Sequence, residues 1–249
     1  MLKNFLKTSF SYFKKITRFL GFEISRYSKA KRLFPVHAEL EHNGIEILSN
    51  SDFNKSCIEI KNFTLLDTPR LANLWMLSQL SDKDGAIIEI GSYKGGGAKH
   101  LSNANPERKV IVCDPFDDKS FQEIDNSVDS NFFHGQFSNT SYDSVVKLLS
   151  GCNAEVIKGY FPNSVGEKKL PKISFVYLDV DVYKATFESL IFLVSNQCLL
   201  EKHIILLDDY KRSCDGIDKA VKEFLSFYPS YKALPLFPGQ GVLIPETFF

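Results

Sequence analysis

A short apolar run that ends in carboxylates is the feature that most constrains the fold of this chain. Residues 175–183 read FVYLDVDVY, so four strand-forming residues lead directly into Asp179 and Asp181. A buried strand of a parallel sheet has this pattern, because both of its faces are covered by apolar side chains. In open α/β sheets, ligands bind at the carboxyl edge, where such strands end. The run therefore predicts an α/β fold with a ligand site at Asp179 and Asp181.

A second run repeats the pattern 29 residues further on. Residues 204–207 are all Ile or Leu, and Asp208 and Asp209 follow them. If the two strands are neighbours, these aspartates converge with Asp179 and Asp181 on one edge of the sheet. Four carboxylates repel one another unless a positive charge lies among them. A hard divalent cation, which prefers oxygen ligands, is the simplest such charge.

The rest of the chain alternates between strand and helix patterns, which predicts βαβ units and a mostly parallel sheet with helices on both faces. Residues 238–240 read PGQ between two final strands and predict a C-terminal β-hairpin, which adds an antiparallel strand. The predicted strands are 86–90, 109–114, 154–158, 173–178, 203–207, 231–237 and 241–244, and the predicted helices are 64–80, 141–149, 183–196 and 215–227.

The first 62 residues differ from this pattern. Residues 1–20 carry apolar side chains at alternating spacings of three and four, which predicts an amphipathic helix, and residues 1–34 contain nine basic residues and one acidic residue. The helix either lies on an anionic membrane surface or packs on the protein body or a second subunit. Residues 21–62 show only weak strand patterns and are expected to be an irregular connection. We therefore predict an N-terminal helical extension over residues 1–62 and a catalytic domain over residues 63–249.

Composition limits the cellular setting. Lys plus Arg equals Asp plus Glu at 30 each, so the overall charge argues neither for nor against a nucleic-acid partner. We predict no such partner. The five cysteines are scattered, odd in number and without a CxxC pair, which is typical of reduced thiols. No apolar run approaches the ~20 residues of a membrane span, and no secretory signal is visible. We expect a cytoplasmic protein, with membrane contact limited to residues 1–20.

A glycine-rich turn follows the first predicted strand. Gly91, Gly95, Gly96 and Gly97 allow backbone to approach a ligand where side chains would clash. The pattern is neither the dinucleotide fingerprint, since Tyr93 stands where a glycine is needed, nor a P-loop. It favours a ligand without a pyrophosphate. An ordinary turn between strand and helix is the alternative.

Two acidic residues flank this turn. Asp114 ends the second predicted strand, 23 residues after Gly91. An acid in this position can accept hydrogen bonds from both ribose hydroxyls of a nucleoside, or it can simply cap a turn. Glu89, just before the glycines, either fixes a ligand amine or anchors the loop.

These residues together resemble a known family. Residues 89–95, EIGSYKG, resemble the first motif of class I S-adenosylmethionine-dependent methyltransferases. Residues 159–162 (GYFP), 178–183 (LDVDVY) and 207–210 (LDDY) resemble, more specifically, the macrocin O-methyltransferases, which methylate sugar hydroxyls in bacterial natural products. The resemblance covers residues 63–244.

The resemblance implies a Rossmann-like fold with a seven-stranded sheet, S-adenosylmethionine as the methyl donor, Mg²⁺ as a second cofactor and a sugar or glycan acceptor. We also expect a homo-oligomer. The implied cofactor-binding residues are Glu89, Gly91, Ser92, Tyr93, Gly95 and Asp114, and the implied metal ligands are Asp179, Asp208 and Asp209. The spacing is also similar to catechol O-methyltransferase, but the lysine base of that enzyme has no counterpart, because position 182 is valine.

The chemistry agrees with this resemblance. A sugar hydroxyl is a poor nucleophile at neutral pH, and coordination to Mg²⁺ lowers its pKa. Asp179 or Asp181 is then placed to take the proton as the catalytic base, and methyl transfer requires in-line alignment. Each acid has a structural alternative: Asp181 would cap a helix that starts at Tyr183, and Asp208 with Asp209 would form a turn.

Two other functions are open from the sequence. A haloacid dehalogenase-type phosphatase also has a strand that ends in Asp-x-Asp and a later acidic pair for Mg²⁺, but its nucleophile strand usually comes first in the chain. A non-catalytic member of the methyltransferase fold would bind partners through its basic N-terminal helix.

Overall fold

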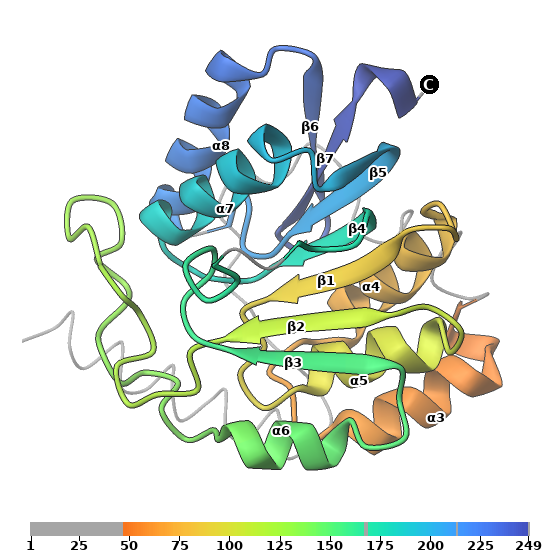
Figure 1. The fold of residues 1–249 in the computed structure, drawn as a ribbon. Coiled ribbons are helices and arrows are strands. Elements are labelled where there is room, and N and C mark those ends of the chain that lie inside the picture. Colours follow the sequence, from red (N-terminus) through yellow and green to blue (C-terminus); the bar gives the residue numbers. More distant parts are fainter. Residues whose placement is uncertain (1–46, 167–168, 213, 249) are drawn as a thin grey trace, which may run out of the picture. The chain divides into compact units, whose positions relative to one another are not determined.

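The computed structural model describes residues 47–166, 169–212 and 214–248, and one compact unit runs from Gly44 to Phe249. Strands and helices alternate along it as the sequence predicts (Figure 1). The helices are α3 (Ser51–Ile60), α4 (Thr68–Leu80), α5 (Gly96–Ala104), α6 (Tyr142–Leu148), α7 (Tyr183–Ser195) and α8 (Asp215–Phe227), and a short 3-10 helix η2 (Glu246–Phe248) ends the chain. The strands are β1 (Ala86–Ile90), β2 (Val110–Asp114), β3 (Ala154–Lys158), β4 (Ile173–Leu178), β5 (Leu199–Leu207), β6 (Tyr231–Leu236) and β7 (Gln240–Pro245).

The seven strands form one sheet in the order β3-β2-β1-β4-β5-β7-β6. Strands β1 to β5 pair in parallel, whereas β7 runs antiparallel to both β5 and β6. The Rossmann-like seven-stranded sheet and the closing hairpin are therefore confirmed. Strand β5 begins at Leu199, four residues before the predicted start at His203.

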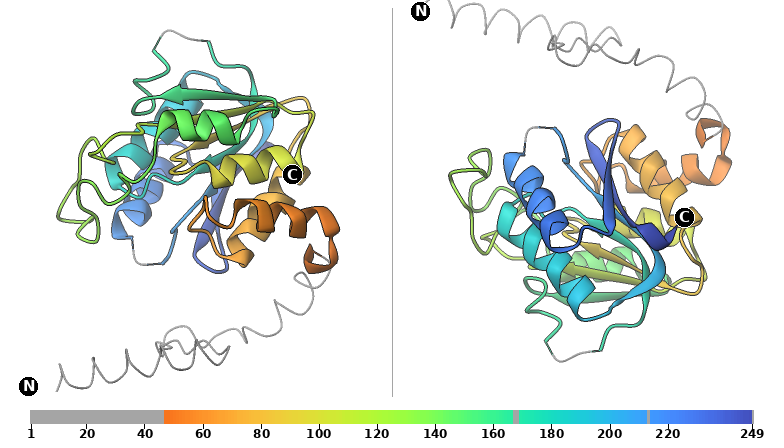
Figure 2. Two further views of the ribbon diagram at one scale, coloured as in Figure 1. Left: turned by 90° about the horizontal axis from the view of Figure 1, so that it is seen from below. Right: turned by 90° about the horizontal axis from the view of Figure 1, so that it is seen from above.

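Helices cover both faces of the sheet, as Figure 2 shows from below and from above. Alternate strand residues point to opposite faces, so Ile87 packs with side chains of α4, α5 and α6, while Ile88 packs with those of α7 and α8. Strands β1, β2 and β4 are buried along their whole length. This explains their continuous apolar runs.

Helix α3 lies where we expected an irregular connection, so that expectation is wrong for residues 51–60. The side chain of Asn50 caps the helix by accepting the backbone N–H groups of Asp52 and Phe53. The ring of Phe53 then packs edge-on against Trp75 of α4, with centroids 5.7 Å apart. The predicted helix over residues 1–20 lies outside the described residues, and the division into residues 1–62 and 63–249 stays a prediction.

Candidate active site

A pocket opens at the carboxyl ends of β1, β2, β4 and β5, the edge at which the sequence predicts the ligand site. Its walls contain all of the predicted site residues except Gly95. Gly95 instead forms the N-cap of α5 with a positive φ of 83°, and a side chain there would meet Val145. Gly95 therefore shapes the turn and does not face the pocket.

The glycine loop passes very close to the end of β4. Gly91 has φ of 84°, and a Cβ atom there would come within 3.0 Å of the backbone carbonyl oxygen of Asp179. Glycine is required on both counts. The next two backbone N–H groups, of Ser92 and Tyr93, donate to Oδ2 of Asp114 at 2.8 and 2.9 Å. Asp114 thus fixes the loop that leads into α5.

Asp114 has little acceptor capacity left for a ligand. Its Oδ1 accepts the backbone N–H of Phe116 at 2.8 Å, in addition to the two bonds at Oδ2. A carboxylate offers about four lone pairs as acceptors, and the three backbone hydrogen bonds leave about one of them for a ligand. Burial raises the pKa of Asp114, while these backbone hydrogen bonds oppose the rise. The three backbone bonds use part of the acceptor capacity of this carboxylate, and its binding of the ribose hydroxyls stays a prediction.

Glu89 lies beneath the loop and is 1% exposed. The hydroxyl of Ser92 donates to its Oε2 at 2.5 Å, and a Cβ atom at Gly97 would come within 3.0 Å of its Oε1. Burial raises the pKa of Glu89 to about 8, helped by the charge of Asp114 and opposed by the bond from Ser92. Glu89 therefore anchors the loop, and its neutral form is the favoured one at pH 7.

The four predicted aspartates do converge. Leu178 and Leu207 are in register on the neighbouring strands β4 and β5, so Asp179 and Asp208 leave the sheet side by side. Burial raises the pKa of Asp179 well above its usual range, and the carboxylates of its three acidic neighbours add to the effect. The pKa of Asp181 is raised in the same way. Arg70 and Arg212 bring positive charge to Asp208 and Asp209, but two arginines do not balance four carboxylates.

Two of these aspartates occupy strained backbone. Asp181 has φ of 64° and Asp209 has φ of 55°, a left-handed conformation that non-glycine residues rarely adopt. Such strain is concentrated at functional sites. The N-cap of α7 is Val182, without a side-chain cap, so the alternative in which Asp181 caps that helix is not what the structure shows.

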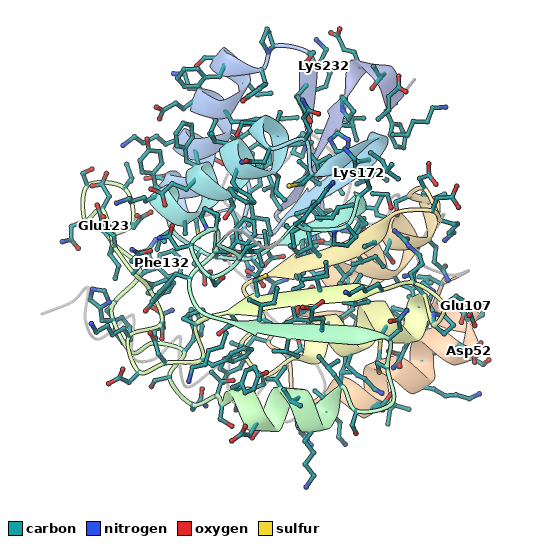
Figure 3. The ribbon with its side chains drawn as sticks, viewed as in Figure 1. Asp52, Glu107, Glu123, Phe132, Lys172 and Lys232 are labelled. Carbon is teal, nitrogen blue, oxygen red and sulfur yellow. The ribbon has the colours of Figure 1, made fainter. Side chains whose placement is uncertain are left out.

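A long loop over residues 115–141 covers this side of the pocket and lies beside the start of α7 (Figure 1). Asp129, in this loop, accepts the backbone N–H of Tyr183 at 3.0 Å and so supplies the missing cap. Glu123, labelled in Figure 3, forms an ion pair with Lys184 of α7. The loop, which lines part of the pocket, is thus joined to the helix that follows Asp181.

Two site residues have no signal in the sequence. Arg70, in the first turn of α4, is 9% exposed, and its Nη1 lies 2.5 Å from Oδ2 of Asp208 and 3.8 Å from Oδ1 of Asp209. Burial alone would lower the pKa of Arg70, but the charges of Asp208, Asp67 and Tyr177 and the hydrogen bond to Asp208 together outweigh burial and raise the pKa. Gln240, in β7, donates to Oδ1 of Asp208 at 2.8 Å. Both partners are distant from Asp208 along the chain, so only folding reveals them.

The donor set suits a hard divalent cation, because it consists of four carboxylates whose negative charge exceeds the positive charge of the two neighbouring arginines. The side chains are not arranged around a common point, however. In the described part of the chain, no group of three His, Cys, Asp or Glu residues is placed to hold a metal ion. Instead, Arg70 supplies positive charge to Asp208, and Nη1 of Arg212 lies 3.1 Å from Oδ1 of Asp209.

Comparison with solved structures shows which fold this chain shares. The fold matches the O-methyltransferase NovP with a TM-score of 0.61 at 17% identity, over 74% of this chain and 81% of that one. It also matches a Bacillus cereus O-methyltransferase solved with SAH (TM-score 0.54, 14% identity, 84% and 97% coverage). The calicheamicin methyltransferase CalS11 gives a TM-score of 0.51 at 18% identity, with 85% and 87% coverage. The fold is that of the class I S-adenosylmethionine-dependent methyltransferases.

The family follows from the sequence. The macrocin O-methyltransferase model matches residues 61–228, and the chain belongs to this family. It is accordingly an O-methyltransferase, and the phosphatase alternative is not retained. Curated protein sequences give no match to this chain.

Proposed function

We propose that this enzyme transfers a methyl group from S-adenosylmethionine to a hydroxyl of a sugar or glycoconjugate, and that Mg²⁺ assists the transfer. The observation that carries the proposal is that the glycine loop and the four-aspartate cluster open into the same pocket. A methyl donor on the loop and a hydroxyl on the cluster would then be neighbours. The family name and the printed title of CalS11, a calicheamicin methyltransferase, agree with a natural-product acceptor.

The protein's own residues would divide the work. The loop around Gly91 and Ser92, with Asp114 behind it, binds the donor and fixes its orientation for in-line transfer. Asp179, Asp208 and Asp209 would hold the cation, which supplies a lowered pKa for the acceptor hydroxyl. The carboxylate of Asp181 takes the hydroxyl proton. The negative cluster would also attract the positively charged sulfonium of the donor.

The metal role is tested by Asp208→Asn, with exposed Asp143 in α6 as the site of a matched control, Asp143→Asn. Candidate sugars and glycans are first screened by mass spectrometry for the gain of one methyl group. We expect Asp208→Asn to lower turnover about 100-fold or more, because metal assistance is worth several kcal/mol. Affinity for S-adenosylhomocysteine should stay nearly unchanged, and the control should retain full turnover. Full activity of the wild-type enzyme in EDTA would refute metal assistance, and the absence of methyl gain on any sugar would refute the acceptor class.

The setting of the enzyme is also a proposal, and it is supported by the sequence. We propose a cytoplasmic homo-oligomer that contacts anionic membranes through residues 1–20, or uses them for subunit contact. No helix in the described residues is both long and apolar enough to cross a bilayer. Light scattering and co-sedimentation with anionic vesicles, on the full chain and on a chain lacking residues 1–20, separate the two roles. A full chain that is monomeric and does not co-sediment with vesicles would refute both the membrane contact and the subunit contact.

A further inference from the structure

Asp208 is held at both of its carboxylate oxygens. Its side chain is 2% exposed. Oδ2 accepts a hydrogen bond from Nη1 of Arg70 at 2.5 Å, and Oδ1 accepts one from Nε2 of Gln240 at 2.8 Å. These partners come from α4 and from the closing hairpin, respectively. A carboxylate bonded at both oxygens cannot rotate without breaking a buried hydrogen bond, which is costly. The plane of this carboxylate is therefore fixed by the fold.

The amide of Gln240 is itself fixed in orientation. Gln240 is fully buried, and its Oε1 accepts Nδ2 of Asn73 at 2.9 Å. Asn73 Nδ2 also donates to the backbone carbonyl of Phe237 at 2.8 Å, at the hairpin turn. A carboxylate only accepts hydrogen bonds, so the donor end of Gln240 must face Asp208 and its oxygen must face Asn73. The three side chains form a single chain of hydrogen bonds from α4 through β7 to the acidic cluster.

The antiparallel strand brings this amide to the site. Leu207, the last residue of β5, is in register with Gly241 of β7. The residue after Leu207 is Asp208, and the residue before Gly241 is Gln240, so the two face each other just beyond the end of the pairing. The C-terminal hairpin, which carries none of the predicted site residues, thus contributes a contact to the acidic cluster.

We propose that Gln240, oriented by Asn73, is a positioning residue that fixes the carboxylate of Asp208 for binding of a divalent cation; this rests on the metal-assisted function proposed above. A neutral amide donates one hydrogen bond to Oδ1 and leaves the negative charge of Asp208 for the cation. Arg70 acts differently, because its positive charge at Oδ2 competes with that of the cation. Hydrogen-bond partners behind metal ligands typically change metal affinity by 10- to 100-fold when they are removed.

The experiment measures binding of Mn²⁺, as a paramagnetic substitute for Mg²⁺, to the full chain. Gln240→Met preserves the side-chain length and removes the donor, and Asn73→Ala removes the group that orients it. The matched control is Gln79→Met at the far end of α4, where Gln79 donates to the backbone carbonyl of Ala104 at 3.0 Å. Free Mn²⁺ is followed by electron paramagnetic resonance, S-adenosylhomocysteine binding by calorimetry and folding by Tm.

We expect Gln240→Met to raise the Kd for Mn²⁺ about 10- to 100-fold, with a smaller rise in Asn73→Ala and none in Gln79→Met. Affinity for S-adenosylhomocysteine should be unchanged in all three. Equal Mn²⁺ affinity in the wild type and Gln240→Met would overturn the positioning role alone. A wild-type chain that binds no Mn²⁺ would overturn the metal function and the positioning role with it. If Gln240→Met does not fold, the Kd of Asn73→Ala for Mn²⁺ tests the proposal instead. A parallel loss of Mn²⁺ and S-adenosylhomocysteine affinity in Asn73→Ala would indicate a purely structural contact and overturn the proposal.

Discussion

Replacing Glu89 by glutamine is expected to remove a pH dependence of stability that the wild-type protein carries at one buried carboxyl. Burial raises the pKa of Glu89 from 4.5 to about 8. Between these values, the folded protein holds a proton that the unfolded chain has released. The stability from this group is therefore complete below pH 4.5 and is lost as the pH rises towards 8. Glutamine has nearly the same shape as glutamate but no ionisable group, so the stability of the variant does not fall with pH at this position.

The magnitude follows from the width of the window. From 4.5 to about 8 is about 3.5 pH units, which at about 1.4 kcal/mol per unit sets a ceiling of about 5 kcal/mol. Over the two units from about pH 5.5 to 7.5, the wild-type protein should lose about 2 to 3 kcal/mol relative to Glu89→Gln. Carboxyls that do not interact with Glu89 titrate equally in both proteins and cancel in the difference, whereas Asp114, whose charge interacts with Glu89, contributes to it.

The assay is urea unfolding of cofactor-free wild-type and Glu89→Gln protein at pH 5.5, 6.5 and 7.5, with the free energy of unfolding taken from the midpoint and slope. The difference between the two proteins should grow steadily in favour of the variant as the pH rises. A difference that does not change with pH would refute the reasoning, because it would mean that Glu89 has the same protonation state in the folded and unfolded chains.

Two further predictions concern the glycine loop. Asp114→Asn should weaken S-adenosylhomocysteine binding about 10-fold or more in calorimetry. The single amide oxygen cannot accept hydrogen bonds from all three backbone N–H groups, and a buried donor without a partner costs about 1–3 kcal/mol. Unchanged affinity would contradict the role of this carboxylate. Gly91→Ala should destabilise the protein by about 2 kcal/mol more than Gly151→Ala in thermal unfolding. Both glycines have positive φ, but a Cβ atom at Gly91 would come within 3.0 Å of another backbone segment, whereas nothing lies within 4 Å of a Cβ atom at Gly151. Equal losses would show that the close approach is unimportant.

The local patterns were sufficient to predict the sheet and the acidic cluster. The run into Asp179 and the run into Asp208 each combine a buried strand with the polar residue that follows it, and both signals lie within a few neighbouring residues. Parallel neighbouring strands then force the two ends together. Helix α3 has a weaker signal in the sequence, because its cap residue Asn50 directly follows residues with a weak strand pattern.

The partners of the cluster were not predictable, because no local pattern marks them. Arg70 reaches Asp208 across 138 positions of the chain, and Gln240 reaches it across 32. Asp129 caps α7 from 54 positions away. An arginine, a glutamine or an aspartate in such segments is ordinary until the fold gives it a buried neighbour.

The sequence by itself determined the class of fold, the family and the edge of the sheet where chemistry takes place, since strand periodicity, glycine turns and strand-end carboxylates are written in consecutive residues. Only the tertiary structure decided how the acids are held: Asp114 is largely occupied by the loop it supports, Glu89 is buried enough to favour its neutral form, and Asp208 lies between Arg70 and Gln240. The physical reason is that burial, charge and hydrogen bonding at a carboxylate depend on groups that approach through space.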